Sequence, residues 1–164
     1  MNAWDWIICE RTSRWAAAVR VALERESTAE LRAARVVEVR NHRDLESRLS
    51  ARPDALVTIE VERANLAAVL AWLGTAGPRY PRATFVAVLD RLFVADQNAN
   101  GDVSVPDVEQ ALVEAGAMLV VRLPRAMKPL LDLAQRHAAR AAAAADGELS
   151  PVERVWASLP WQDG

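Results

Sequence analysis

Apolar residues along this chain follow two alternating patterns. Short runs of mainly apolar, β-branched and aromatic residues predict strands that are covered on both faces. Between these runs, apolar residues recur at the i, i+3, i+4 and i+7 spacing of amphipathic helices. The predicted strands are residues 3–9, 35–40, 55–61, 84–89 and 117–121.

The segment 107–124 shows both patterns most clearly. Val108 opens an apolar helix face that continues at the helical spacing to Ala115. Gly116 predicts the end of this helix, because glycine adopts the left-handed C-cap conformation without a steric clash. The apolar residues that follow predict a short buried strand.

Other helix ends are indicated by single residues. A thiol or hydroxyl among residues 9–13 is expected to cap the first helix, and Asn41, with Asp44 three residues on, is expected to cap the second. Breakers at Gly74, Gly77 and Pro78 predict the end of the helix that follows the third strand.

Strands that alternate with helices in this way predict an α/β fold. We expect a parallel five-stranded sheet with right-handed crossovers and helices on both faces, which is a three-layer αβα sandwich. In such sheets functional groups gather at the C-terminal ends of the strands. The candidate site residues there are Glu10, Glu60, Asp90 and Arg122.

Composition agrees with one folded domain. The chain has 164 residues, of which 52% are hydrophobic, and we expect a domain at 1–145 and a tail at 146–164. Its net charge of −2 gives no general attraction to nucleic acids or acidic membranes. A signal peptide and a membrane span are not evident, so a cytoplasmic protein is expected. The sole cysteine, Cys9, is expected to be buried and excludes an intramolecular disulfide.

Two segments resemble the receiver domain of bacterial response regulators. They are Arg-Pro-Asp-Ala-Leu-Val at 52–57 and Ala-Gly-Ala at 115–117, which is followed by Pro124. The resemblance covers residues 3–145 and implies a flavodoxin-like sheet with strand order 2-1-3-4-5. It also implies a site with two acids for Mg²⁺ after strand one, a phosphoaccepting aspartate in strand three, a hydroxyl ending strand four and a lysine-proline pair after strand five.

The chain differs from the family at each of these positions. Glu10 is a single acid, Glu60 lies one residue beyond the phosphoacceptor position, Asp90 replaces the hydroxyl and Arg122 the lysine. The resemblance therefore implies a degenerate, non-catalytic pseudo-receiver without a cofactor. Its expected role is to bind another protein, or a second copy of itself, through the fourth helix, fifth strand and fifth helix. An active phosphoacceptor receiver is one alternative.

A second alternative is a calcium-binding module. Residues 96–107 fit the pattern D-x-N-x-N-G-x-V-S-x-x-D and resemble an EF-hand or dockerin-type loop. A solvated loop, in which Ser104 caps the next helix and Pro106 lies in its first turn, explains the same residues. The candidate ligands are Asp96, Asn98, Asn100, Ser104 and Asp107.

In the tail, residues 150–153 are expected to open a short turn of helix that carries large apolar residues. They either fold back onto the domain or form a peptide motif that a partner binds. Trp4 and Trp6 can line the same edge of the domain as these tail residues. Trp72 is expected at the rim of the core. His42 and His137 are expected at the surface or rim. The candidate partner-binding residues of the tail are Val155, Trp156, Leu159 and Trp161.

Overall fold

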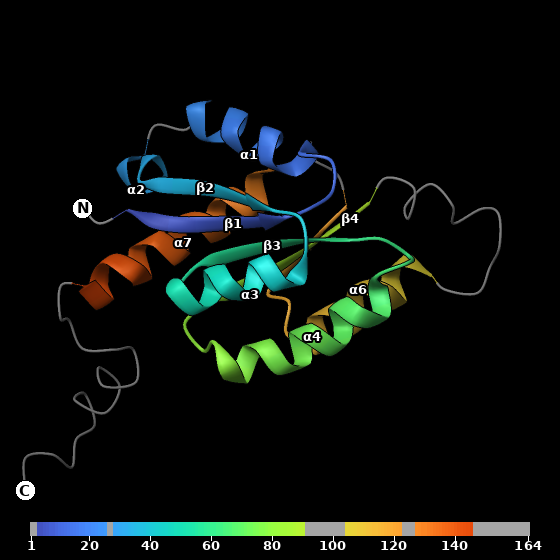
Figure 1. Ribbon diagram of the computed structural model, residues 1–164. Helices are drawn as coiled ribbons and strands as arrows, with labels where there is room; N and C mark the ends of the chain where they lie inside the picture. The colour runs from blue at the N-terminus through green and yellow to red at the C-terminus, as the bar shows by residue number, and fades with distance from the viewer. Residues whose placement is uncertain (1–2, 26–27, 91–103, 123–126, 146–164) are drawn as a thin grey trace, which may run out of the picture.

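The fold is a parallel five-stranded sheet with helices on both faces (Figure 1). The computed structural model describes residues 3–25, 28–90, 104–122 and 127–145. The strand order is β2-β1-β3-β4-β5, which confirms the predicted flavodoxin-like topology. The strands are β1 (Trp4–Cys9), β2 (Ala34–Val39), β3 (Leu56–Val61), β4 (Thr84–Leu89) and β5 (Leu119–Val121).

Two groups of helices enclose the sheet. On one face, α1, α2 and α7 pack against Trp6, Ile8 and their neighbours, and on the other α3, α4 and α6 pack against Ile7, Ile59 and theirs. Successive strand residues point to opposite faces, so each strand contributes to both cores. The helices are α1 (Arg14–Arg25), α2 (Ala29–Arg32), α3 (His42–Ala51), α4 (Leu66–Arg79), α6 (Val105–Glu114) and α7 (Met127–Ala145). None of these helices is both long and apolar enough to cross a membrane.

Two of the predicted helix ends have the expected chemistry. Asn41 accepts a hydrogen bond from the backbone N–H of Asp44 at 2.9 Å, which confirms the cap of α3. Gly116 has a φ of 118°, and the N–H of Ala117 donates to the carbonyl of Leu112 at 2.9 Å. Because that φ is unfavourable for residues with a Cβ, the turn between α6 and β5 depends on glycine.

The predicted end of α4 is wrong. The helix continues through Gly74, Gly77 and Pro78 to Arg79. Its buried side chains, which include Trp72 and Ala76, hold the last turns on the core, and this packing outweighs the weak helix propensity of glycine. Pro78 is tolerated because it removes a single backbone bond one residue before the helix ends.

The prediction for His137 is also wrong, because this side chain is 2% exposed. Its Nδ1 lies 3.0 Å from the hydroxyl of Thr84, which also accepts a hydrogen bond from Arg140 at 2.9 Å. The ring of Trp4 packs against the His137 ring, with 5.4 Å between the two ring centroids. Trp4 and Trp6 are themselves buried and so do not line an open edge. The apolar face of α7 places His137 in the core, which the alanine-rich helix sequence did not reveal.

Trp72 and His42 lie at the rim of the core, as expected. Trp72 is buried at the edge of its cluster, and the half-buried ring of His42 lies 5.8 Å from it. Strand β5 is two residues shorter than predicted, since pairing with β4 begins at Leu119.

Burial of His137 predicts an acid-sensitive fold. Burial and, secondarily, the charge of Arg140 lower the pKa of His137 from 6.5 to about 4. Between these pH values the unfolded chain binds the proton and the folded chain does not, so stability is lost as pH falls from 6.5 to 4. The loss attributable to this group is about 3 kcal/mol, measurable by urea unfolding across that range.

The variant His137→Asn keeps a hydrogen-bonding side chain and is expected to flatten this part of the pH profile. His42→Asn is the matched control and should leave it unchanged. Equal profiles for His137→Asn and the natural chain would contradict the assignment.

Candidate functional site

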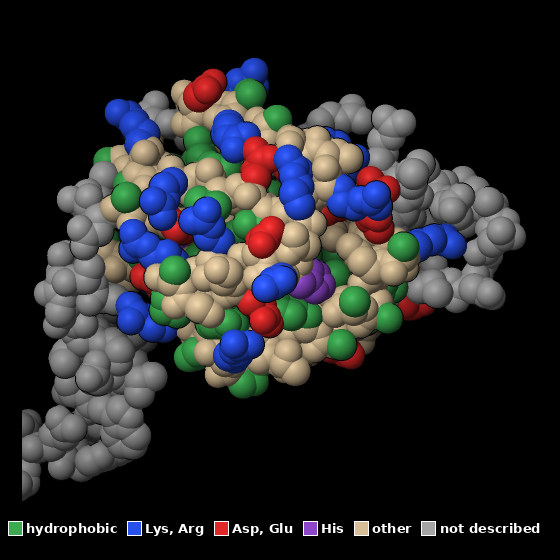
Figure 2. Space-filling view, in the orientation of Figure 1, with side chains coloured by type: hydrophobic (Ala, Val, Ile, Leu, Met, Phe, Trp, Pro, Cys, Tyr) green, Lys and Arg blue, Asp and Glu red, His purple; other side chains and the backbone are tan. Residues whose placement is uncertain are grey.

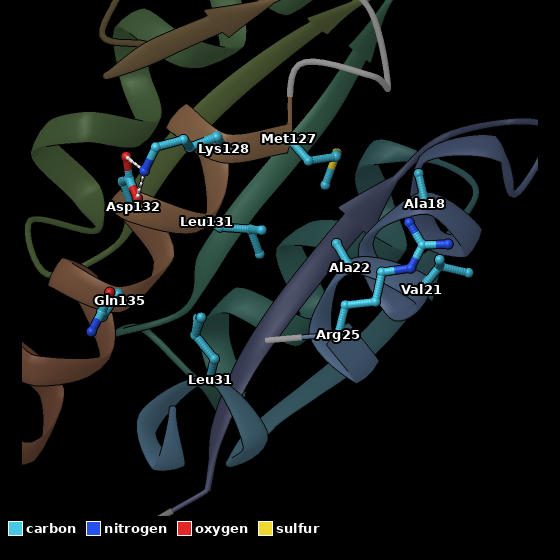
Figure 3. Close-up of a pocket in the computed structure, with 10 residues that line it drawn as sticks. All are labelled: Ala18, Val21, Ala22, Arg25, Leu31, Met127, Lys128, Leu131, Asp132 and Gln135. Atoms are coloured by element: carbon cyan, nitrogen blue, oxygen red, sulfur yellow. Dashed lines mark hydrogen bonds and ion pairs between the residues drawn. The ribbon is translucent and has the colours of Figure 1, made fainter. Parts of the chain in front are cut away.

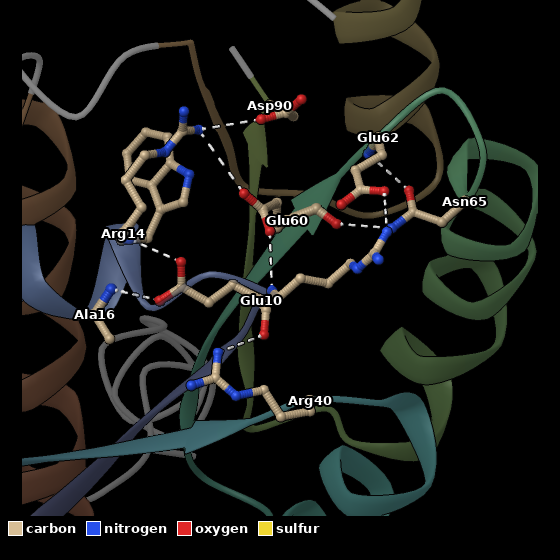
Figure 4. Close-up of polar contacts among 10 residues, drawn as sticks. Glu10, Arg14, Ala16, Arg40, Glu60, Glu62, Asn65 and Asp90 are labelled. Atoms are coloured by element: carbon tan, nitrogen blue, oxygen red, sulfur yellow. Dashed lines mark hydrogen bonds and ion pairs between the residues drawn. The ribbon is translucent and has the colours of Figure 1, made fainter. Parts of the chain in front are cut away.

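Three acidic side chains meet at the C-terminal ends of β1, β3 and β4 (Figure 4). Glu10 directly follows β1, Glu60 is the penultimate residue of β3, and Asp90 directly follows β4. Glu10 is 2% exposed and Glu60 4% exposed, whereas Asp90 is half-buried. The parallel register of the sheet brings these residues together, as the sequence predicted.

Glu10 forms the N-terminal cap of α1. Its Oε2 accepts a hydrogen bond from the backbone N–H of Trp15 at 2.8 Å, and its Oε1 accepts one from Ala16 at 2.7 Å. The expected cap by a thiol or hydroxyl is therefore wrong. The hydroxyl of Ser13, a residue with a φ of 57°, donates instead to Glu38 at 2.8 Å. Both carboxylate oxygens of Glu10 are thus engaged by the helix.

Arg14 places a cation between the other two acids. Its Nη2 lies 3.8 Å from Oε1 of Glu60 and 3.7 Å from Oδ1 of Asp90 (Figure 4). The candidate site residues taken from the sequence did not include Arg14. One feature of the sequence could have indicated a role for Arg14. A basic residue in the first turn of a helix opposes the helix dipole, and α1 has no acidic residue in that turn.

Backbone and side-chain donors complete the surroundings of Glu60. The N–H of Arg11 donates to its Oε2 at 3.1 Å, and the amide of Asn65 donates to its carbonyl oxygen at 3.0 Å. Burial raises the pKa of Glu60, and the negative charges of Glu10 and Asp90 raise it further, whereas Arg11 and Arg14 act in the opposite direction. The cluster therefore depends on its own positive charge to hold three carboxylates together.

Two positions that the receiver resemblance makes important lie elsewhere. The phosphoacceptor position, one residue before Glu60, is Ile59, whose side chain is 1% exposed in the core that faces α3 and α4. Arg122 forms a paired contact with Glu109 of α6, with Nη2 2.6 Å from Oε2. Arg122 is thus directed at α6, and its pKa is raised by that hydrogen bond.

Cys9 is a buried apolar side chain, as expected. Burial, reinforced by the charges of Glu60, Asp44 and Glu10, raises the pKa of its thiol to about 11. The thiol therefore stays protonated at neutral pH and is a poor nucleophile.

Most of the calcium-loop residues, namely Asp96, Asn98 and Asn100, lie outside the described residues, and so does the whole tail with Val155, Trp156, Leu159 and Trp161. Ser104 and Asp107 are described. The hydroxyl of Ser104 accepts a hydrogen bond from the backbone N–H of Asp107 at 3.3 Å and so caps α6. Pro106 lies in the first turn of this helix. In the described part of the chain, no three His, Cys, Asp or Glu side chains are arranged to hold a metal ion.

The chain has the fold of a CheY-like response-regulator receiver domain. It is similar to a CheY-like protein (TadZ) from Pseudomonas aeruginosa PAO1, with a TM-score of 0.57 and 16% identity over 82% of this chain and 94% of that one. A response regulator from Thermotoga maritima gives a TM-score of 0.58 and 15% identity over 84% and 98%.

The RcsB response regulator of Salmonella typhimurium gives a TM-score of 0.52 at 16% identity, and covers 97% of this chain and 69% of its own. No family model matches the chain. No curated protein matches it either. At such low identity the similarity establishes the fold, and the role of the site must be argued from its own residues.

The cap of α1 gives a direct test of this site. Replacing Glu10 with alanine leaves two buried N–H groups without acceptors and removes a charge near Arg14. We expect a loss of about 2 kcal/mol in the free energy of unfolding, measured by urea titration.

The control is Glu62→Ala, which removes a more exposed ion pair with Arg11 and should cost under about 1 kcal/mol. Equal losses for the two variants would show that Glu10 does not stabilise α1 in this way.

Proposed function

We propose that this chain is a non-catalytic, receiver-like module that binds another protein in signalling or assembly, and that its state does not depend on phosphorylation. The observation that carries the proposal is the guanidinium of Arg14 between Glu60 and Asp90. This guanidinium lies among the acids, where the receiver resemblance implies a divalent metal.

The residues present do not fit Mg²⁺. This ion needs near-octahedral oxygen ligands at about 2.0–2.1 Å and binds through one or two available carboxylates. Both oxygens of Glu10 are committed to α1, and the remaining two acids are paired with Arg14. A metal would have to displace the guanidinium, and Ile59 offers no oxygen to receive a phosphoryl group.

The face formed by α6, β5 and α7 supports a role in protein binding. Val113 is 53% exposed and Met118 62% exposed, and both line a hollow of about 620 Å³ between α6 and β5. Apolar side chains that gather in an exposed hollow are typical of interaction sites. Methionine suits such a surface because its unbranched side chain adapts to a partner.

Charge favours a protein over a nucleic acid as the partner. The net charge is −2, and Figure 2 shows basic and acidic side chains interspersed over the visible face. A mixed surface of this kind gives no general attraction to a phosphate backbone.

The first prediction from this proposal concerns phosphotransfer. Incubation of the chain with a small phosphodonor and Mg²⁺ is expected to leave its intact mass unchanged, because Ile59 occupies the phosphoacceptor position and the carboxylates of the cluster are engaged by α1 and Arg14. An active receiver domain assayed in parallel is the positive control. A single phosphoryl adduct on this chain would contradict the proposal.

The second prediction concerns the partner surface. Introducing charge with Val113→Glu and Met118→Glu should reduce capture of specific partners from a cell extract by about tenfold or more, measured by quantitative mass spectrometry. Ala68→Glu, at an exposed position of α4, is the matched control and should capture the same proteins as the natural chain.

Light scattering on the same variants tests a second copy of the chain as the partner. Unchanged capture and unchanged mass in solution for the Val113 and Met118 double variant would exclude this face.

A further inference from the structure

A second hollow lies between α1, α2 and α7, away from the acidic cluster and from the α6–β5 hollow. It has a volume of about 600 Å³. Figure 3 shows Met127 and Leu131 of α7 directed toward α1, with Leu31 of α2 at one end of the space. Ala18, Val21 and Ala22 of α1 form the opposite wall. We call this space the α1–α7 groove.

The groove leaves apolar surface uncovered. Val21 is 45% exposed, and Ala18, Ala22 and Met127 are half-buried. Neither the receiver-like site nor the α6–β5 face uses these residues. A groove of this volume with apolar side chains on both walls is within the range of sites that hold a large side chain or a ligand.

The tail has the pattern of a helix that fits such a groove. Ser150, Pro151 and Glu153 have the N-cap, N1 and N3 residue types of a helix start. The apolar residues that follow share one face at the i, i+3, i+4 and i+7 spacing, which is how amphipathic helices bind apolar grooves. They are Val152, Val155, Trp156 and Leu159.

The tail is long enough to return to the groove. Helix α7, which forms one wall, ends at Ala145. Leu131 lies fourteen residues before this end, which is about 21 Å along the helix. The five residues from Ala145 to Ser150 span up to about 17 Å when extended, and six further residues of helix to Trp156 add about 9 Å, which gives about 26 Å in all. This span exceeds the 21 Å along α7, so Trp156 can reach the groove when the tail runs back alongside that helix.

Charge favours the same arrangement. Residues 146–164 contain four acidic side chains and one basic side chain, a net charge of −3. Arg25 and Lys128 lie at the rim of the groove, and Asp132, which pairs with Lys128 at 3.3 Å, is the acidic residue among those that line it. An acidic segment is thus attracted toward a rim with a net positive charge.

We propose that residues 150–161 of this chain bind as a helix in the α1–α7 groove of the same molecule, with Val155, Trp156 and Leu159 against Val21, Met127 and Leu131. The tail then covers the apolar surface of α1. This proposal is independent of the phosphorylation and partner arguments, because it uses neither Arg14 nor the α6–β5 face.

Hydrogen exchange of the full chain tests this docking. In the natural chain we expect amides 152–159 to exchange about tenfold or more slowly than an unstructured peptide of the same sequence. Val21→Glu adds a negative charge to an exposed groove position and should return these amides to within about twofold of the free rate.

Ala17→Glu adds the same charge to the same helix outside the groove and should leave the protection unchanged. Trp156→Ser should remove the protection from the tail side and speed exchange in α1. Amides of α3 and α4, on the other face of the sheet, report that each variant remains folded.

Three results would overturn the proposal. The first is free exchange of the tail in the natural chain, which would leave the groove without this occupant. The second is tail protection that survives Val21→Glu. The third is protection that disappears on dilution, which would assign the groove to the tail of a second copy.

Discussion

The carboxylate of Glu10 is the group on which the candidate site depends. A helix begins with backbone N–H groups that have no partner within the helix, and burying them without acceptors is costly. Glu10 supplies two acceptor oxygens from the end of β1, so it fixes where α1 starts and how it approaches the sheet. Because Arg14 is the first residue of α1, the same interaction sets the position of the guanidinium between Glu60 and Asp90.

This arrangement explains how three acids can lie together at the sheet edge of a receiver fold, with the guanidinium of Arg14 between two of them. Three carboxylates at the ends of neighbouring strands repel one another, and the pKa of Glu60 is raised first by burial and then by this repulsion. In this chain the guanidinium of Arg14 and the first N–H groups of α1 offset this repulsion. Similarity to solved receiver domains at 15–16% identity shows that the backbone fold is shared. The chemistry of the site follows from the side chains of Glu10, Arg14, Glu60 and Asp90.

Among the described residues, two hollows with exposed apolar side chains lie on different elements. One lies between α6 and β5, and the other between α1, α2 and α7. The first exposes Val113 and Met118, and the second exposes Val21. Binding at such surfaces needs shape and apolar area rather than a reactive group.

The sequence by itself determined the fold class, the strand order implied by the receiver resemblance, the cap at Asn41 and the turn at Gly116. These follow from local patterns: strand and helix periods, capping residues and one glycine conformation. It also located Glu10, Glu60 and Asp90, because the ends of parallel strands meet at one edge.

Only the tertiary structure decided the continuation of α4 through two glycines and a proline, the burial of His137, and the placement of Arg14 between two acids. Each of these depends on packing or charge between residues distant in the chain. Local propensity and periodicity contain no information about such partners, so these features had to come from the folded molecule.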